Sequence, residues 1–257
     1  MMTIDQSLLD EVERIAREAG NAIMSVYARD FSIEEKDDKS PLTEADKAAH
    51  HIIVRGLKAL PCQFPILSEE DVEGFSGADR EGRYWLVDPL DGTKEFIKRN
   101  DEFTVNIALI ENGKPILGVV TAPALDIGYI AAEGLGAFKV DANGERKAIA
   151  VAGKPKAGMA WRVLGSRSHP SPDLAAWLEK LGKHTMLSMG SSLKLCLIAE
   201  GSADVYPRIG PTCLWDTGAA HAVVLYAGGR VVNLEGEAIS YANPNEKLNP
   251  HFVVWGY

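Results

Sequence analysis

The stretch WLVDPLDGT (residues 85–93) carries the most specific signal in this chain of 257 residues. Its apolar start, typical of a buried strand, ends in the carboxylate of Asp88. A turn at Pro89 is expected to bring the carboxylate of Asp91 close to the first, and Gly92 allows a sharp change of backbone direction. A helix is predicted to begin at Thr93. The stretch thus predicts a strand, a turn and a helix start with two acids at the junction.

Two carboxylates at this spacing indicate a site for a divalent cation, because Mg²⁺ prefers hard oxygen ligands and shares them with water and substrate phosphate. The backbone N–H groups at the start of the following helix are suited to a phosphate. The alternative is an ordinary Asp-Pro-x-Asp-Gly turn, in which Asp and Gly occur for conformational reasons. The nine residues alone leave both interpretations open.

Three further segments place acids at the ends of predicted elements. Glu69 and Glu70 directly follow an apolar run, Asp46 lies beside a predicted helix start at Glu44, and Asp216 begins an apolar helix. For Asp46 and Asp216 the alternative is helix capping, which favours acids at these positions without any catalytic role. Either interpretation is compatible with each segment taken singly.

Together these segments resemble the inositol monophosphatase superfamily, whose members are Mg²⁺-dependent, lithium-sensitive phosphatases. The resemblance rests on DPLDGT at 88–93, WDTGA at 215–219 and the Glu69-Glu70 pair. Within the superfamily, LSEED (67–71), DGTKEFIKR (91–99) and GSSLK (190–194) are similar to the CysQ-type 3'(2'),5'-bisphosphate nucleotidases. The likeness extends over essentially the whole chain.

The resemblance implies a binding site for two or three Mg²⁺ ions. Glu69, Asp88 and the backbone carbonyl of Leu90 would hold one ion, and Asp88, Asp91 and Asp216 a second. Two divalent ions about 3.5–4 Å apart neutralise charge on the attacking and leaving oxygens of a phosphoryl transfer and lower the pKa of bound water. An acidic first half is consistent with such a site, since residues 1–153 hold 17 basic and 28 acidic side chains.

The same resemblance assigns catalytic roles to four side chains. Asp46 and Thr93 would orient and deprotonate the attacking water, with help from Glu69 or Glu70. The backbone N–H groups of Gly92 and Thr93 would bind the phosphate that is cleaved. Water would attack the phosphorus directly, without a phosphoenzyme.

The middle of the chain has the opposite charge balance, with 8 basic and 4 acidic side chains in residues 154–208. In the resembling nucleotidases such positions bind the nucleoside and the phosphate that is not cleaved. We expect Ser191, Lys194 and Arg208 to bind that phosphate, together with His169. The alternatives are a solvated helix face for Lys194 and a surface ion pair for Arg208. The expected set of substrate contacts also includes residues shared with the metal and phosphate sites, namely Glu69, Leu90, Asp91, Gly92, Thr93 and Asp216.

Composition excludes several classes of protein. A formal charge of −9 and a pI near 5.2 argue against a nucleic-acid-binding surface, which needs a basic face. Three scattered cysteines are too few for a disulfide framework and indicate a cytoplasmic protein with reduced thiols. Neither a signal-peptide pattern nor an integral membrane segment is visible, so the alternative location is peripheral, on the inner face of the plasma membrane. A monomer or a homodimer is expected.

The pattern of elements predicts an α/β fold with an α+β first half. Helical spacing of apolar residues indicates helices over about 8–26 and 44–60, and alternation around Asn112-Gly113 indicates a β-hairpin. After residue 153, short strands alternate with helices over about 171–181, 191–200 and 216–227. The resemblance to the phosphatase superfamily further implies a layered αβαβα sandwich of two lobes. Residues 1–153 would form the metal-binding lobe, and residues 154–257 would add substrate contacts and the last metal ligand.

The function predicted from these observations is hydrolysis of adenosine 3',5'-bisphosphate to AMP and phosphate, and also of 3'-phosphoadenylyl sulfate, in sulfur assimilation. One alternative is an inositol monophosphatase of the same superfamily. The other is a non-catalytic phosphate-binding module, which would be favoured by loss of a metal carboxylate. Glu69, Asp88, Asp91 and Asp216 are all present.

Overall fold

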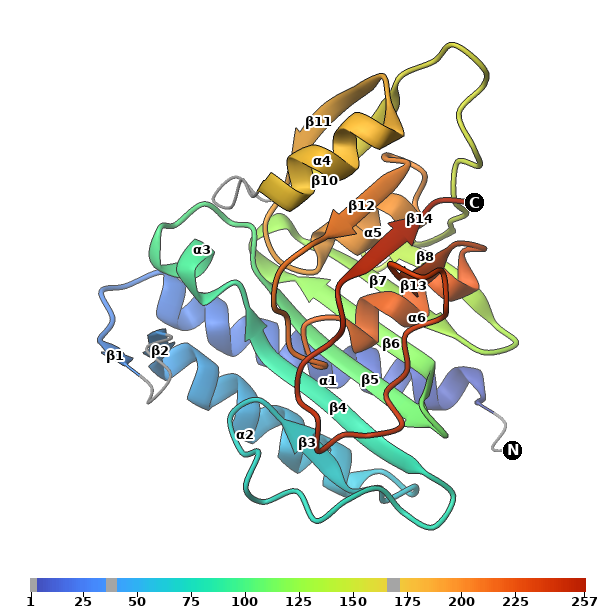
Figure 1. Ribbon diagram of the computed structural model, residues 1–257. Helices are drawn as coiled ribbons and strands as arrows, with labels where there is room; N and C mark the ends of the chain where they lie inside the picture. Colours follow the sequence, from blue (N-terminus) through green and yellow to red (C-terminus); the bar gives the residue numbers. More distant parts are fainter. Residues whose placement is uncertain (1–3, 36–40, 166–171) are drawn as a thin grey trace.

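The two larger β-sheets of the computed structural model alternate with three layers of helices, which makes five layers in all (Figure 1). The structure describes residues 4–35, 41–165 and 172–257. Within these ranges no helix is both long and apolar enough to cross a membrane. The predicted αβαβα sandwich is confirmed.

The larger sheet has seven strands in the order β3-β4-β5-β6-β7-β8-β9. Its strands are β3 (Ile66–Ser68), β4 (Arg83–Asp91), β5 (Thr104–Glu111), β6 (Lys114–Ala122), β7 (Ile127–Ala132), β8 (Gly136–Val140) and β9 (Arg146–Ala148). Only β3 and β4 run parallel within it, so the carboxyl ends of these two strands lie at the same edge. The predicted hairpin joins β5 to β6, with Asn112 and Gly113 at φ 50° and 79°, as two-residue turns of this kind require.

Two long helices cover one face of this sheet. They are α1 (Gln6–Tyr27) and α2 (Glu44–Ala59), which pack against each other and against β4, β5 and β6. Their apolar sides are buried in a core with the outward side chains of the sheet, including Trp85, Phe103 and Val105. A short hairpin of β1 (Ile33–Glu35) and β2 (Pro41–Thr43) precedes α2. Both predicted helices of the first half are confirmed.

The smaller sheet has five strands in the order β11-β10-β12-β14-β13. They are β10 (Trp161–Gly165), β11 (His184–Ser188), β12 (Val205–Arg208), β13 (Arg230–Asn233) and β14 (Phe252–Trp255). Strand β10 runs parallel to β11 and β12, whereas β12, β13 and β14 pair antiparallel. Outside this sheet lies α4 (Pro172–Leu181), which packs Trp177 and Leu178 onto it. The alternation predicted after residue 153 is confirmed.

The layer between the sheets holds α5 (Leu193–Ala199) and α6 (Gly218–Tyr226). Helix α6 lies directly on the seven-stranded sheet, where a Cβ atom at Gly118 would come 2.2 Å from the carbonyl oxygen of Ala219. One hydrophobic core therefore contains residues from both halves of the chain, such as Leu86 and Val223. Because α6 is held against β5 and β6, the residues just before it are brought to the first half's sheet.

Candidate active site

The two aspartates of the 85–93 stretch lie on one continuous strand rather than on either side of a turn. Strand β4 runs through Pro89 to Asp91, and its register with β5 shifts so that Asp88 pairs with Asn106 while Asp91 pairs with Thr104. A bulge absorbs the extra residue without ending the strand, and it tolerates a proline that cannot donate a ladder hydrogen bond. The prediction of a turn at Pro89 is thus wrong. The two carboxylates nevertheless lie close together, as expected, because the bulge leaves both of them at the end of β4.

Gly92 and Thr93 lie immediately after this strand end. Gly92 has φ +95°, and a Cβ atom there would be 3.1 Å from the carbonyl oxygen of Glu102. This left-handed conformation and close approach favour glycine. A short helix, α3 (Thr93–Ile97), then begins at the predicted residue. The hydroxyl of Thr93 lies 3.3 Å from both Asp46 Oδ1 and the carbonyl oxygen of Leu90, either of which can accept its proton.

Asp46 belongs both to a helix cap and to the site. Its Oδ2 accepts hydrogen bonds from the backbone N–H of Thr43, at 2.8 Å, and from the Thr43 hydroxyl, at 2.6 Å, in a capping box at the start of α2. Its Oδ1 faces Thr93. The capping alternative and the catalytic interpretation are therefore compatible, because each uses a different oxygen of one buried carboxylate.

Two further acids, Glu69 and Asp216, come to the end of β4 from two other segments of the chain. Glu69 directly follows β3, and its N–H donates to the carbonyl of Val87 on the parallel neighbour β4. Asp216 lies two residues before α6, and its Oδ2 accepts a 2.8 Å hydrogen bond from the N–H of Cys213. Asp88 Oδ1 likewise accepts from the N–H of Leu90, at 3.1 Å. Backbone groups thus orient the carboxylates of Asp88 and Asp216 by one oxygen each.

The charges of these acids act on one another. Burial raises the pKa of Asp88 well above its ordinary value, and the charges of Glu69, Asp91 and Asp216 raise this pKa further. Burial, followed by the charge of Asp91, raises the pKa of Asp216 to about 8. Buried carboxylates in this arrangement favour a bound cation, which would offset both the desolvation and the mutual repulsion.

The chemistry of this donor set fits Mg²⁺, which binds carboxylate and carbonyl oxygens and completes its shell with water and phosphate. Across the described ranges, however, no three His, Cys, Asp or Glu side chains as placed form a group that could by itself hold a metal ion. Mg²⁺ commonly takes only one or two carboxylates from the protein and completes its shell with water and substrate phosphate, so a site of this kind does not need three converged side chains.

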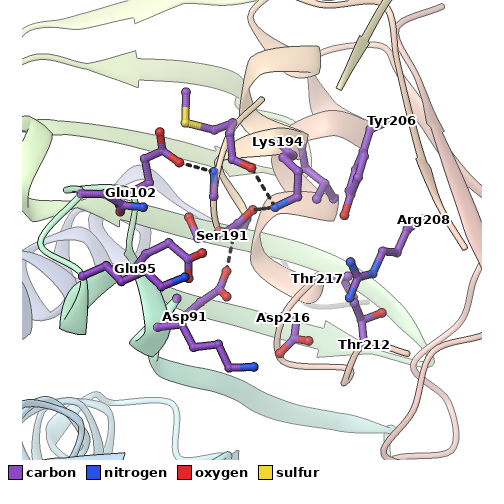
Figure 2. Close-up of a pocket in the computed structure, with 18 of the residues that line it drawn as sticks. Asp91, Glu95, Glu102, Ser191, Lys194, Tyr206, Arg208, Thr212, Asp216 and Thr217 are labelled. Atoms are coloured by element: carbon purple, nitrogen blue, oxygen red, sulfur yellow. Dashed lines mark hydrogen bonds between the residues drawn. The ribbon is translucent and has the colours of Figure 1, made fainter. Parts of the chain in front are cut away.

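A cavity of about 390 Å³ extends from these acids towards the five-stranded sheet. Figure 2 shows Asp91 and Asp216 on one side of it and Lys194, Tyr206 and Arg208 on the other. We call Asp91 and Asp216, together with Asp88, which lies at the end of β4 and does not itself line the cavity, the acidic wall, and Lys194 and Arg208 the basic wall. The structure thus brings cations from the second half of the chain opposite metal-ligand candidates from both halves.

Backbone carbonyl groups hold both members of the basic wall. Lys194 Nζ donates to the carbonyl of Ser191 at 2.6 Å and lies 5.5 Å from the centre of the Tyr206 ring. Burial lowers the pKa of Lys194, an effect that the charge of Asp91 opposes. Arg208 Nη2 donates to the carbonyl of Pro211 at 2.8 Å. Its buried Nε has no hydrogen-bond partner within the described part of the chain, which suits an anion in the cavity.

Comparisons with known proteins agree with this geometry. The model of the inositol monophosphatase family matches residues 5–252. The chain belongs to the inositol monophosphatase family. Enzymes of this family are metal-dependent phosphatases, generally with Mg²⁺. The resemblance predicted from the motifs is confirmed.

Individual members of the family are similar along almost their whole length. The 3'(2'),5'-bisphosphate nucleotidase CysQ of Escherichia coli O157:H7 is 52% identical over 250 residues, which cover 96% of this chain and 99% of the relative. The 3'(2'),5'-bisphosphate nucleotidase CysQ of Haemophilus influenzae is 33% identical over 258 residues, which cover 100% of this chain and 95% of the relative. The crystal structure of CysQ from Bacteroides thetaiotaomicron matches with a TM-score of 0.82 and 39% identity, over 98% of this chain and 97% of that one.

The structure also places the remaining family positions. Ser191, at φ +45°, lines the cavity next to Lys194. Glu70 follows Glu69, and its N–H donates to the Ser68 hydroxyl at 3.4 Å. His169 lies outside the described residues, so its predicted contact with substrate stays a prediction.

Sequence reasoning missed two residues beside Asp91. Asn106 Nδ2 lies 3.4 Å from Asp91 Oδ2, and the backbone N–H of Ser192 donates to the same oxygen at 2.6 Å. A signal for Asn106 was available, because it is the one amide in the otherwise apolar or hydroxyl-bearing run FTVNIALI (103–110). No comparable signal marks Ser192, whose contact depends on how the chain folds.

Proposed function

We propose that this chain is a Mg²⁺-dependent 3'(2'),5'-bisphosphate nucleotidase that hydrolyses adenosine 3',5'-bisphosphate to AMP and phosphate. The observation that carries the proposal is 52% identity, over nearly the full length of both chains, to a nucleotidase of that activity. The cavity supports it, because a substrate with two phosphates needs a metal-binding wall for one and a cationic wall for the other. 3'-Phosphoadenylyl sulfate shares this layout and is a second proposed substrate, which places the enzyme in sulfur metabolism.

The proposed metal ligands are Glu69, Asp88, the carbonyl of Leu90, Asp91 and Asp216, for two or three Mg²⁺ ions. When bound, the ions would neutralise charge on the phosphoryl oxygens and lower the pKa of a bound water. Support comes from the raised pKa values of Asp88 and Asp216, which show that the site without a cation is electrostatically unfavourable.

The proposed nucleophile is a water held by Asp46 and Thr93. The Thr93 hydroxyl can give its proton to Asp46 Oδ1 and accept one from the water, so that the water oxygen keeps a lone pair towards the phosphorus. A bond then forms from this oxygen to phosphorus as the bond from phosphorus to the ribose 3' oxygen breaks, and the 3' oxygen takes a proton from solvent water to leave as the 3'-hydroxyl of AMP. Glu69 or Glu70 would assist in accepting the proton of the water, and the N–H groups of Gly92 and Thr93 would bind the phosphoryl oxygens.

The phosphate that is not cleaved is assigned to Ser191, Lys194 and Arg208, with His169 as a further contact. The buried Arg208 Nε supports this assignment, because a phosphate oxygen would satisfy it. We further propose that residues 1–153 act as the metal-binding lobe and residues 154–257 as the lobe that adds substrate contacts and Asp216. The chain passes from the larger to the smaller sheet between β9 and β10, on either side of residue 153.

Phosphate release from a panel of adenosine 3',5'-bisphosphate, inositol 1-phosphate and fructose 1,6-bisphosphate, with Mg²⁺ and with excess EDTA, tests the proposal. We expect adenosine 3',5'-bisphosphate to have the highest kcat/KM and EDTA to abolish turnover. Preference for inositol 1-phosphate would replace the proposal by the inositol monophosphatase alternative. Absence of turnover with every substrate would favour the binding module.

A further inference from the structure

Three buried polar residues connect the acidic wall to the loop that precedes the basic wall. They are Thr104 and Asn106 on β5 and Ser192 at the start of α5, whose exposed fractions are 0%, 1% and 2%. The Thr104 and Ser192 hydroxyls lie 2.9 Å apart, and the Ser192 hydroxyl donates to Asn106 Oδ1 at 2.9 Å. Asn106 Nδ2 in turn donates to Asp91 Oδ2 at 3.4 Å. We call these four residues the Asp91 chain.

The direction of the hydrogen bonds in the Asp91 chain follows from its last member. A carboxylate oxygen accepts, so the amide of Asn106 must turn its nitrogen to Asp91 and its oxygen to Ser192. Ser192 must then use its only hydroxyl proton towards Asn106, which leaves Thr104 as the donor to Ser192. The donor and acceptor roles of Asn106, Ser192 and Thr104 are therefore fixed by the carboxylate of Asp91, which can only accept.

The bulged strand β4, its partner β5 and the loop at 189–192 all contribute residues to the Asp91 chain. Asn106 lies opposite Asp88 in the register of β4 and β5, and its side chain contacts Asp91. Ser192 follows Ser191 and lies two residues before Lys194, and its own N–H donates to Asp91 Oδ2 at 2.6 Å. Asp91 Oδ2 therefore receives one donor from each side, from Asn106 on β5 and from Ser192 in the loop at 189–192. Figure 2 shows the second of these, the hydrogen bond from the loop to Asp91.

We propose that Asn106 and Ser192 are positioning residues that aim the Asp91 carboxylate and couple Mg²⁺ binding to nucleotide binding. Fixing Oδ2 between two donors leaves Oδ1 in one direction, which lowers the entropy lost when a cation binds there. A phosphate bound at Ser191 and Lys194 would restrain the loop that carries the Ser192 N–H, and a cation on Asp91 would restrain the same loop through that N–H. By thermodynamic linkage each ligand then raises the affinity for the other by the same factor. The nucleotide half of this inference rests on the proposed function.

Asn106→Leu tests the proposal, because leucine has a similar volume and lacks both amide groups. Outer partners of a ligand typically contribute 10- to 100-fold to metal affinity. We therefore expect the Mg²⁺ concentration that gives half of the maximal thermal stabilisation to rise about tenfold. The matched control is Thr104→Val, which breaks the Asp91 chain at its far end. The backbone of Thr104 pairs with Asp91, but its hydroxyl bonds to Ser192 and to neither Asp91 nor Asn106. Its Mg²⁺ midpoint should change by less than about twofold.

A purely structural role for Asn106 predicts a different result. Both variants would then lower the melting temperature in EDTA, and the Mg²⁺ midpoint would stay at the wild-type value. That outcome, or an equal shift in Thr104→Val, would overturn the proposal. Should Asn106→Leu fail to fold, Ser192→Ala serves instead, because it keeps the N–H bond to Asp91 and removes only the hydroxyl that orients Asn106. A Mg²⁺ midpoint raised about threefold is expected for it, and an unchanged midpoint would contradict the proposal.

Kinetics test the coupling to nucleotide. In the wild type, the KM for adenosine 3',5'-bisphosphate should fall as Mg²⁺ rises, and in Asn106→Leu this dependence should weaken while high Mg²⁺ restores most of kcat. A KM that depends on Mg²⁺ equally in both proteins would refute the coupling. If the wild type does not hydrolyse this substrate, the proposed function fails, yet the Mg²⁺ midpoints still decide whether Asn106 positions Asp91.

Discussion

The acidic wall of the cavity is anchored on a nine-residue strand within a seven-stranded sheet, whereas the basic wall stands on a seven-residue helix and the end of a four-residue strand. Backbone N–H groups orient Asp88, Asp91 and Asp216, and backbone carbonyls hold Lys194 and Arg208. Asp88, Asp216, Lys194 and Arg208 are thus each held by backbone groups close to them in the sequence, whereas Asp91 is held by the N–H of Ser192, at the start of the helix that carries Lys194. Among the described residues, the hydrogen bonds of the two walls do not join Asp91 or Asp216 directly to Lys194 or Arg208.

Keeping the acids apart from the cations allows one wall to bind metal ions and the other to bind a phosphate. Acids that are held apart from the opposing cations remain able to bind metal ions, and cations that are held by carbonyl groups remain able to bind a phosphate. Direct ion pairs between the walls would neutralise both and close the cavity. Changes in the acidic wall should accordingly lower kcat, and changes in the basic wall should mainly raise KM.

The largest effect is expected for Asp91→Asn. Loss of one ligand charge at nearly constant side-chain size should reduce kcat for adenosine 3',5'-bisphosphate by at least about 1,000-fold, since charge stabilisation by metal ions supplies several kcal/mol. In EDTA the variant should melt at a higher temperature than the wild type, because burial raises the pKa of Asp91, although the charge of Lys194 and the hydrogen bonds from Ser192 and Asn106 oppose this effect. Phosphate release and differential scanning calorimetry measure the two effects. Wild-type kcat in this variant would refute the metal-site assignment.

A smaller loss of kcat is expected for Thr93→Val, which keeps the shape of the side chain and removes its hydroxyl. Positioned acid–base groups contribute about 100- to 10,000-fold, and we expect a loss near the lower limit because Asp46 remains. Thr93→Ser is the control, since it retains the hydroxyl that faces Asp46 Oδ1. The ratio of kcat values at saturating Mg²⁺ is the measurement. Equal activity of the valine and serine variants would remove Thr93 from the proposed mechanism.

Arg208→Lys tests the basic wall. Lysine keeps the charge but lacks the planar fork of donors that matches a phosphate, so the KM for adenosine 3',5'-bisphosphate should rise about tenfold with little change in kcat. Adenosine 3'-monophosphate, which has no second phosphate, is the control substrate, and its KM should be nearly unaffected. An equal rise for both substrates would show that Arg208 does not bind the second phosphate.

The smallest effect concerns the helix that follows Asp216, where buried His221 of α6 lies 3.0 Å from the Tyr241 hydroxyl. Burial lowers the pKa of His221 to about 3 from an ordinary 6.5. Below pH 6.5 the imidazole of His221 binds a proton in the unfolded state but not in the folded state. The free energy of unfolding is therefore unaffected by His221 above pH 6.5 and falls as the pH is lowered towards 3.

Melting temperatures measured between pH 7 and 4 test this statement. They should fall less steeply for His221→Gln than for the wild type, because glutamine does not titrate. His51→Gln is the control, since His51 is exposed and bonds to the carbonyl of Lys47 in its own helix. Parallel curves for wild type and His221→Gln would contradict the prediction.

Much of the fold could be predicted from local patterns. The spacing of apolar residues indicated α1 and α2 to within one or two residues, and Asn112-Gly113 indicated the hairpin, because both signals depend on near neighbours in the chain. The path of β4 through Pro89 could not be predicted in this way. A proline in a strand is tolerated only at a bulge, and the bulge depends on pairing with β5.

The candidate site, like the fold, has parts that local sequence patterns predict and parts that depend on contacts between distant residues. By itself the sequence determined the family and the acids that serve it, because the motifs at 69–70, 88–93 and 215–219 each lie within a few consecutive residues. Only the tertiary structure decided that Asp46 Oδ1 faces Thr93 and that Ser192 and Asn106 share one oxygen of Asp91. These contacts join residues 15 to 101 positions apart, and no local pattern encodes them. They follow from the packing of α2 against β4, the pairing of β4 with β5, and the packing of α5 against α6, which itself lies on the larger sheet.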